Sequence, residues 1–302
     1  MERVTAVVVT YNRFELLKRC IDSLRQQTHK LNSIIVVDNG CTDGTSEWLD
    51  EQSDLDVIHQ NNVGGSGGFF RGIQDAHEKN NDWIWCMDDD VYPANNCLEE
   101  LLRFKSQDVG IICPLRNQNG RKIVTEIKKF NLSNPLLSLH NTRLSLEEVN
   151  RLEAVEIEGI SFEGPLIKDK VVESIGLPNK DLFLLYDDSD YGYRTIIAGY
   201  KILLVSKAIL HKEFFYQGES RESIIRKNKW KLFYHIRNTA FFNKKHGKNI
   251  FVKYVRSFGL ATKYTTIIIV NNLINDKYEW SDVSMPFKAF HDGIYGILGK
   301  RL

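Results

Sequence analysis

Two apolar runs near the start of the chain most constrain its fold. Residues 4–10 (VTAVVVT) and 34–37 (IIVV) are near-continuous apolar stretches, typical of strands that are buried on both faces. The segment between them carries apolar residues at helical spacing, namely Leu17, Cys20, Ile21 and Leu24. Strand, helix and strand in this order make a βαβ unit. The sequence therefore predicts an α/β fold with a mostly parallel sheet flanked by helices.

Polar side chains follow three of the predicted strands at their carboxyl ends. The three groups are Tyr11-Asn12-Arg13, Asp38-Asn39-Gly40 and Asp88-Asp89-Asp90. Ligands of open parallel sheets bind outside this edge of the sheet. We therefore expect the three groups to meet in one crevice.

The third group is the most informative, because three adjacent carboxylates end the apolar run WIWCM at residues 83–87. Neighbouring carboxylates repel one another and favour a cation that neutralises them. A hard divalent cation with oxygen ligands would do so, and Asp88 and Asp90 can face it together because alternate residues of a strand share a face. The alternative, on these residues alone, is an acidic turn in contact with solvent.

A glycine-rich segment lies between the second and third groups. Residues 61–72 read NNVGGSGGFFRG, and a helix is expected to begin near Gly67 or Gly68. Glycines let the backbone N–H groups approach an anion, and the helix N-terminus adds positive potential. Arg71 could clamp a phosphate or form a structural salt bridge. A flexible loop is the alternative, and the segment lacks the Lys of a Walker loop.

A second acidic cluster, Asp187-Asp188, follows the apolar run at residues 182–186. One of these residues could cap the helix expected through residues 193–198 while the other faces the crevice. His211 stands just beyond a strand expected at residues 200–205. Imidazole suits manganese and similar ions, although a lone histidine is more often structural.

Charge divides the chain into an acidic part and a basic part. Residues 1–220 carry 24 Lys and Arg against 34 Asp and Glu, whereas residues 221–302 carry 16 against 5. We expect a catalytic domain at 1–220, with a variable insertion at 116–155, and a basic, aromatic helical region at 221–302 that meets an anionic partner. No motif for nucleic-acid binding accompanies the basic region.

Helical spacing recurs in the basic region at Phe251, Tyr254, Val255 and Phe258. A basic amphipathic helix of this kind can lie on an anionic membrane, and the alternative is a helix packed on the domain with a solvated basic face. The five cysteines form no Cys-x-x-Cys pair, and neither a signal peptide nor an apolar run long enough to span a bilayer is found. These features favour a reducing, cytoplasmic location.

Taken together, the motifs resemble those of family 2 glycosyltransferases, which have the GT-A fold. The similarity covers residues 3–240 except 116–155. The residues that carry it are 7–13, 36–45, 62–68, Asp88-Asp89-Asp90, Asp187-Asp188 and His211. Within the family, the glycine loop with Phe69-Phe70-Arg71-Gly72 and the pattern from Trp83 to Asp90 most resemble galactofuranosyltransferases, whose close relatives use dTDP-rhamnose.

The resemblance implies a role for each matching residue. Residues that would bind the nucleotide sugar are Thr10, Tyr11, Asn12, Arg13, Asp38, Asn39, Gly65, Arg71, Asp88 and Asp89. Residues that would hold Mn²⁺ or Mg²⁺ are Asp88, Asp90 and His211. Asp188 matches the catalytic base, with Asp187 beside it. Residues expected on the acceptor side are Gly164, His235, Arg237 and Asn238.

Chemical reasoning agrees with these assignments. A departing nucleoside diphosphate needs a Lewis acid, and an attacking hydroxyl needs a general base. The two acidic clusters supply one role each, and no residue suggests a covalent nucleophile, so we expect inversion at the anomeric carbon. The leading hypothesis is transfer of galactofuranose from UDP-galactofuranose to a lipid-linked bacterial surface glycan, by a peripheral protein at the inner face of the membrane.

Three alternatives remain open from the sequence. The first is a rhamnosyltransferase that uses dTDP-rhamnose on the same fold. The second is a sugar-phosphate nucleotidyltransferase, although the N-terminal glycine-rich loop with Lys or Arg that such enzymes carry is absent. The third is a non-catalytic protein that binds nucleotide sugars as a scaffold.

Overall fold

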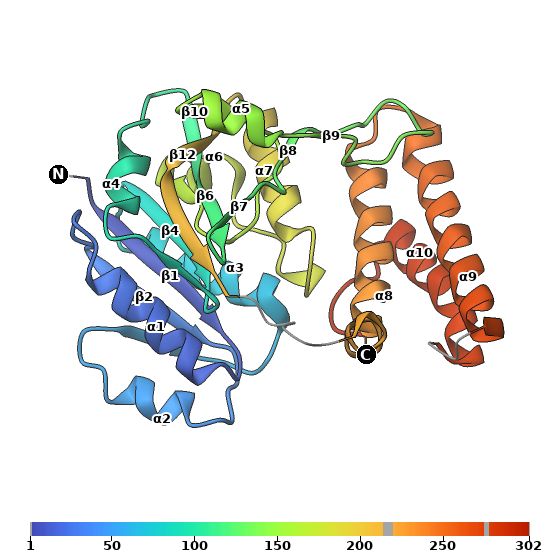
Figure 1. Ribbon diagram of the computed structural model, residues 1–302, viewed down its shortest axis with the longest axis horizontal. Coiled ribbons are helices and arrows are strands. Elements are labelled where there is room, and N and C mark those ends of the chain that lie inside the picture. Colours follow the sequence, from blue (N-terminus) through green and yellow to red (C-terminus); the bar gives the residue numbers. More distant parts are fainter. Residues whose placement is uncertain (1, 214–219, 275–277, 302) are drawn as a thin grey trace. The chain divides into compact units, whose positions relative to one another are not determined.

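A computed structural model describes residues 2–213, 220–274 and 278–301, and the chain folds into two compact units (Figure 1). The first is an α/β unit made of Met1–Lys129, Thr142–Lys180 and Asp187–Phe214. The second is a helical unit made of Phe130–Asn141, Asp181–Tyr186 and Phe215–Leu302. The helical unit therefore takes short segments from the middle of the chain in addition to its C-terminal part.

One large sheet organises the α/β unit. Its strands, within the described residues, are β1 (Val4–Thr10), β2 (Ser33–Asp38), β3 (Asp56–His59), β4 (Trp83–Asp88), β5 (Val91–Pro93), β6 (Val109–Gln118), β7 (Arg121–Ile123), β10 (Ala154–Glu156), β11 (Leu166–Lys168) and β12 (Lys201–Lys212). Their order is β10-β12-β6-β11-β4-β1-β2-β3, with β5 on β12 and β7 on β6. A separate pair is formed by β8 (Ile127–Lys129) and β9 (Thr142–Arg143).

The central pairings of the sheet are parallel. Strand β1 pairs in parallel with β2 and β4, β2 with β3, and β6 with β12. Strand β11 is antiparallel to both β4 and β6, and β5, β7 and β10 are antiparallel as well. The prediction of an α/β fold with a mostly parallel sheet is confirmed. Antiparallel β11 lies between the two parallel sets.

Helices cover both faces of the sheet, as the apolar runs predicted (Figure 1). Those of the α/β unit are α1 (Phe14–Arg25), α2 (Thr45–Asp50), α3 (Gly64–Glu78), α4 (Cys97–Leu102), α5 (Leu146–Arg151), α6 (Asp169–Ile175) and α7 (Asp187–Ile197). Side chains of β1 alternate between two apolar cores: Val8 packs in the core with α1, and Val7 in the core with α3. Helix α3 lies so close to the sheet that a Cβ on Gly72 would sit 2.3 Å from Val7 Cγ1.

Several predicted boundaries differ in the structure. Strand β12 runs on to Lys212, so His211 lies inside a strand and not beyond one. Asp187 and Asp188 form the first turn of α7 and do not cap it.

The apolar run before α7 is not a strand. Residues Lys180–Leu182 form a 3₁₀ turn, and the residues after it adopt left-handed backbone angles at Phe183, Leu185 and Tyr186. Periodicity alone gives no sign of such a conformation, because all three residues are large and apolar or aromatic.

The helical unit has a core of its own. Its helices are α8 (Arg221–His246), α9 (Arg256–Ile274) and α10 (Met285–Tyr295), with a π-helical turn at Phe251–Val255 and a 3₁₀ turn at Trp280–Ser284. Phe233, Tyr234, Ile236, Ala261 and Ala289 are buried among them. The middle segments join by hydrogen bonds: Lys248 N–H donates to Leu132 O at 2.8 Å. No helix among the described residues is long and apolar enough to cross a membrane.

Candidate active site

The central carboxylate of the acidic triad fastens the end of β4 to the end of β1. Thr10 Oγ1 donates to Asp89 Oδ2 at 2.8 Å, and Arg13 Nη1 lies 2.9 Å from Asp89 Oδ1 and 3.1 Å from Asp90 Oδ2. Asp89 is almost fully buried. In this structure Thr10, Arg13 and Asp89, all expected at the nucleotide, hold the two parallel strands together at the mouth of the sheet.

Asp88 and Asp90 belong to a second charge network that reaches β12. Lys212 Nζ lies 3.8 Å from Asp90 Oδ1 and forms a shorter ion pair with Glu163. Arg116 pairs with Glu163 on the other side and with Glu126 at 2.6 Å. Alternating charges thus lead from Asp90 through Lys212, Glu163 and Arg116 to Glu126.

The pKa directions follow from burial and from these partners. Burial, together with repulsion from Asp90 and Glu163, raises the pKa of Asp88 well above its ordinary value. Burial alone would raise the pKa of Glu163 as well, but Arg116 and Lys212 lower it. Glu163 is therefore held as a carboxylate, whereas Asp88 gains most from an additional cation.

The carboxylates fit a divalent cation in their chemistry. Asp88 and Asp90 offer the hard oxygen ligands that Mg²⁺ and Mn²⁺ accept, and Asp90 Oδ1 is a buried atom that accepts no hydrogen bond within the described residues. Mg²⁺ is commonly held by one or two carboxylates together with substrate phosphates. This pair is therefore sufficient on the protein side for that mode of binding.

The expected imidazole ligand faces elsewhere. His211 and Lys212 are neighbours in β12, so their side chains leave opposite faces of the strand. Lys212 takes the face of the carboxylates, and the His211 ring stacks on Tyr92 with a centroid distance of 5.3 Å. Across residues 2–213, 220–274 and 278–301, no three His, Cys, Asp or Glu side chains gather as a metal site.

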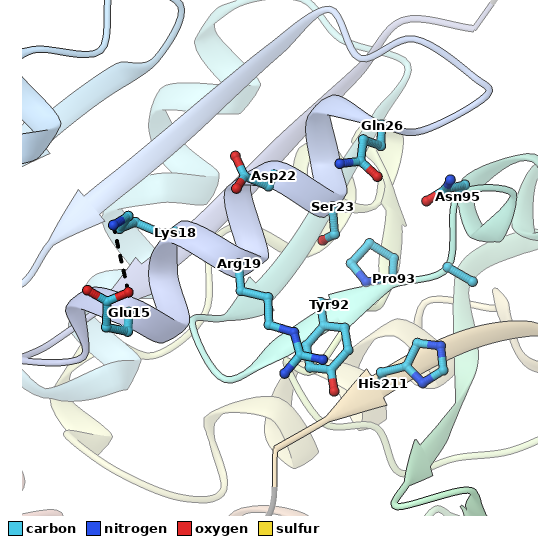
Figure 2. Close-up of a pocket in the computed structure, with 11 residues that line it drawn as sticks. Glu15, Lys18, Arg19, Asp22, Ser23, Gln26, Tyr92, Pro93, Asn95 and His211 are labelled. Carbon is cyan, nitrogen blue, oxygen red and sulfur yellow. Dashed lines mark ion pairs between the residues drawn. The ribbon is translucent and has the colours of Figure 1, made fainter.

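His211 instead lines a surface cavity of about 520 Å³ beside α1 and β5. The Arg19 guanidinium lies over the Tyr92 ring, 3.6 Å from its centroid. His211 lies next to the same ring (Figure 2). Burial and the nearby Arg19 charge lower the pKa of His211. The imidazole is thus kept neutral.

The loop after β2 is organised by Asp38. Its carboxylate accepts from Cys41 N–H at 2.8 Å and Ser46 Oγ at 2.5 Å, and it pairs with His59 Nδ1 at 2.8 Å. Burial alone would raise the pKa of Asp38, but these hydrogen bonds lower it to about 2. In the absence of ligand, Asp38 is therefore a fixed anion that shapes the loop.

Asn12 and Asn39 connect neighbouring loops. Asn12, in a left-handed conformation, accepts from Thr42 N–H at 2.7 Å. Asn39 donates to Gly64 O at 3.1 Å and thereby ties the β2 loop to the start of α3. Tyr11 stands exposed at the same edge of the sheet. The structure thus brings together the ends of β1 and β2 with the glycine-rich segment.

The glycine-rich segment comprises the loop before α3 and its first turns, and the helix begins at Gly64, three or four residues before the start expected from the sequence. A Cβ on Gly65 would meet nothing within 4 Å, so open space adjoins the helix N-terminus there. Such a terminus presents free N–H groups and positive potential to an anion. Arg71 lies farther along the helix, where its Nε pairs with Asp75 at 2.8 Å.

The second acidic cluster starts α7. Asp187 is buried and Asp188 is partly exposed. Burial raises the pKa of Asp187 to about 6, an increase that backbone hydrogen bonds at the start of α7 partly offset. Burial and the charge of Asp187 raise the pKa of Asp188 to about 7. Asp188 is therefore a partly exposed residue whose carboxylate has a proton affinity that suits a general base near neutral pH.

The four residues expected on the acceptor side differ in setting. Gly164 is a packing residue with φ +87°, where a Cβ would sit 2.7 Å from Pro114 Cγ. In the helical unit, burial lowers the pKa of His235. Arg237 and Asn238 are wholly buried and bind backbone carbonyls of their own unit.

Sequence reasoning missed the residues that neutralise the carboxylates. Lys212 and Arg116 supply the positive charge and are joined by Glu163, and Arg116 lies at the start of the stretch expected to be a variable insertion. The position of Lys212 next to His211 was the only available signal. Because β12 continues to Lys212, His211 and Lys212 both lie in the strand and their side chains point to opposite faces. Lys212, and not His211, therefore lies next to the acidic triad.

Comparisons with known proteins relate the chain to glycosyltransferases. A family model described as glycosyl transferase family 2 matches residues 5–176. The chain is 28% identical over 213 residues to galactofuranosyltransferase GlfT1 of Mycobacterium tuberculosis, an alignment that covers 66% of either chain. It is 20% identical over 219 residues to the O-antigen chain rhamnosyltransferase RfbN of Salmonella typhimurium, covering 71% of this chain and 67% of that protein.

A solved structure, GalNAc-T7 with UDP, GalNAc and Mn²⁺, superposes with a TM-score of 0.59 at 15% identity. The superposition covers 90% of this chain and 58% of that one. It shows the GT-A fold. The chain spans about two thirds of the length of the curated relatives named above.

Proposed function

Because the chain belongs to glycosyl transferase family 2 and is a glycosyltransferase, we propose that it transfers galactofuranose from UDP-galactofuranose, with inversion, to a hydroxyl of a bacterial surface glycan. The observation that carries this proposal is the contrast between its two acidic clusters. Asp90, in the same acidic triad as Asp88, forms ion pairs with Arg13 and Lys212, whereas Asp188 is a partly exposed residue with a raised pKa. One cluster suits the diphosphate end of a donor, and the other suits an acceptor hydroxyl.

The proposed reaction is a single displacement. Asp188 takes the proton of the acceptor hydroxyl as that oxygen forms a bond to the anomeric carbon, and the bond from this carbon to the diphosphate oxygen breaks. The electron pair leaves with UDP, and the new glycosidic bond has the opposite configuration. Asp187, which is buried beside the base, raises its proton affinity by like-charge repulsion. The N-terminus of α3 stabilises the departing diphosphate.

Asp88 and Asp90 would hold a divalent cation, Mn²⁺ or Mg²⁺. When bound, the cation supplies Lewis-acid stabilisation of the leaving diphosphate. The residues that prepare the site are Arg13 and Lys212, whose positive charges keep the carboxylates close together while no metal is present. Support for a metal also comes from the GT-A relative, which was solved with Mn²⁺.

The choice of donor sugar rests on the relatives. Three proteins named galactofuranosyltransferase GlfT1 share 28% identity with this chain. The similarity to a rhamnosyltransferase of O-antigen chains favours dTDP-rhamnose as the alternative donor. The name of the rhamnosyltransferase concerns the O-antigen chain, and we propose a lipid-linked glycan acceptor for either donor.

We further propose peripheral association with the inner face of the cell membrane through α9. Residues 223–275 contain eleven Lys and Arg and no Asp or Glu. The outer side of the preceding turn and of α9 exposes apolar side chains: Phe251, Val255, Phe258, Val270, Leu273 and Ile274. An apolar face within an acid-free, basic segment complements an anionic lipid surface.

A donor screen tests the catalytic proposal. The protein is incubated with Mn²⁺, a lipid-linked acceptor mimic and one donor at a time: UDP-galactofuranose, UDP-galactopyranose, UDP-glucose or dTDP-rhamnose. We expect release of UDP from UDP-galactofuranose alone, with a matching mass gain on the acceptor. Release from dTDP-rhamnose alone would move the proposal to the alternative donor. Absence of release from every donor would contradict it.

A further inference from the structure

The segment that precedes the acidic pair of α7 has an unusual backbone. Phe183, Leu185 and Tyr186 have φ values of 64°, 67° and 69°. Residues that have a Cβ rarely adopt these left-handed backbone angles, because the Cβ crowds the following carbonyl oxygen. Strained backbone of this kind persists only where surrounding contacts impose it, and it concentrates at functional sites.

The contacts that impose it come from two adjacent side chains of α8. Asn238 Nδ2 donates to a cluster of carbonyl oxygens, Leu182 at 3.1 Å, Leu184 at 2.8 Å and Leu185 at 2.9 Å. Arg237 Nη2 donates to the Leu182 oxygen as well, at 2.8 Å. One amide and one guanidinium thus bind three carbonyls of the loop, those of Leu182, Leu184 and Leu185.

Arg237 also fixes the orientation of the Asn238 amide. Its Nε donates to Asn238 Oδ1 at 2.8 Å, so the amide nitrogen must face the loop. Its Nη1 donates to Gly299 O at 2.7 Å, which anchors the guanidinium on the other side. Both side chains are wholly buried, so this role leaves no surface for a bound acceptor.

We propose that Arg237 and Asn238 are positioning residues that hold the loop 182–186 in its left-handed form and thereby fix the backbone conformation that leads into the acidic pair. The peptide bond after Tyr186 joins this loop directly to Asp187, the first residue of α7. Thr239 adds a third tie, because its Oγ1 donates to the Tyr186 hydroxyl at 2.7 Å. The inference rests on the proposed function only in assigning Asp188 as the base.

The test removes the amide donor with Asn238→Ala in the full-length protein. Hydrogen exchange followed by mass spectrometry should show amides of residues 182–188 exchanging about tenfold or more faster, because the ties to the carbonyls are lost. With an active donor, kcat should fall about tenfold or more while the Kd for UDP changes less than about twofold. The pH at which kcat is half-maximal should also move downward, since a loosened base is better solvated.

A matched control separates positioning from general stability. Asn243→Ala removes another fully buried asparagine of α8, whose amide donates to Ser257 Oγ at 2.9 Å. We expect it to lower Tm to a similar extent without changing kcat, its pH profile or exchange at 182–188. If Asn238→Ala fails to fold, Asn238→Asp serves in its place, because it is isosteric and keeps the acceptor for Arg237.

A rescue experiment tests the strain directly. Leu185 is partly exposed and left-handed, and glycine adopts that backbone without steric cost. Adding Leu185→Gly to Asn238→Ala should recover about threefold or more of the lost kcat. Unchanged exchange at 182–188 in Asn238→Ala, or an equal effect of Asn243→Ala, would overturn the inference. An inactive wild-type protein whose Asn238→Ala variant still shows faster exchange would contradict the proposed function alone and leave the positioning of the loop standing.

Discussion

Lys212 Nζ lies 3.8 Å from Oδ1 of Asp90, a buried oxygen that accepts no hydrogen bond among the residues the structure describes. The ammonium group neutralises the carboxylates through space while it holds Glu163 by a direct ion pair. Both neighbouring acids therefore keep a cation near them before any ligand arrives. A divalent ion bound at Asp88 and Asp90 would share its site with this positive charge.

Removing that charge should strengthen metal binding. Lys212→Met takes away the cation that repels a divalent ion, so we expect Mn²⁺ alone to bind about fivefold or more tightly near pH 8, as measured by electron paramagnetic resonance. The matched control is His211→Ala, on the opposite face of β12, which should leave the affinity unchanged. Loss of Mn²⁺ binding in the histidine variant would show that the imidazole turns toward the carboxylates.

Asp188→Asn should abolish transfer but not binding. Loss of the general base should lower kcat by about 10²–10⁴-fold, while the Kd for UDP stays within about twofold. In the wild-type protein the pKa of Asp188 is about 7, so kcat should fall as pH drops below that value and level off above it. A variant that retains turnover would remove Asp188 from this role.

The same raised pKa predicts how stability depends on pH. Burial raises the pKa of Asp188 above that of the unfolded chain, so the folded state holds its proton more tightly and loses stability as pH rises through about 7. Asp188→Asn removes this loss. The Tm of the variant should therefore exceed that of the wild type more at about pH 8 than at about pH 5. Equal differences at both pH values would contradict the pKa shift.

The Asp38–His59 pair should stabilise the folded protein more at acidic pH than at basic pH. Hydrogen bonding to Asp38 raises the pKa of His59. The pair therefore stabilises the folded protein fully below the ordinary pKa of histidine, and this stabilisation is lost as the pH rises through the raised pKa of His59. The pKa of Asp38, about 2, keeps the carboxylate charged throughout. A double-mutant cycle with Asp38→Asn and His59→Gln should give a coupling free energy of about 1 kcal/mol near pH 5.5 and less near pH 8.5.

Two glycines of α3 should respond in opposite ways to alanine. A Cβ on Gly72 would lie 2.3 Å from Val7 Cγ1, so Gly72→Ala should lower the free energy of unfolding by about 1–3 kcal/mol in urea denaturation. A Cβ on Gly65 meets open space, so Gly65→Ala should leave stability unchanged or slightly raised. If a diphosphate approaches that backbone, Gly65→Ala should nevertheless weaken UDP binding about fivefold or more by calorimetry.

Membrane association should depend on the exposed face of α9. The double variant Val255→Ser and Leu273→Ser removes apolar area without touching a buried contact, so it should reduce flotation with vesicles that contain about a third anionic lipid. Trp280→Ser, which removes an exposed aromatic residue outside α9, is the control and should float as the wild type does. Flotation that is equal with neutral and anionic vesicles would contradict the electrostatic part of the proposal.

Local patterns predicted the regular parts of the fold well. The runs at Val4–Thr10 and Ser33–Asp38 are apolar because both faces of a parallel strand are covered, so composition alone identifies them. The conformation of Leu185 could not be predicted in this way. It depends on Asn238, which is 53 residues away in the sequence, and a short apolar run resembles a strand unless that contact is known.

The candidate site likewise has features that the sequence predicts and features that it does not. The positions of Asp88 and Asp187 at element ends follow from the sequence pattern, and the structure places both in the α/β unit. The sequence pattern does not predict that Lys212, and not His211, lies next to the carboxylates. Successive side chains of a strand point to opposite faces, so a shift of one residue decides which of two neighbours lies at the carboxylates.

The helical unit is built from three stretches of chain, two of which, 130–141 and 181–186, are embedded in the sequence of the other unit. It is therefore not a cassette that a gene fusion or a single recombination event could exchange. A chimera joined near residue 220 would place Asn238 and Leu184 in different parents and would pair Lys248 with a foreign Leu132. We expect the three stretches to be inherited together, and a successful graft to transplant all of them at once.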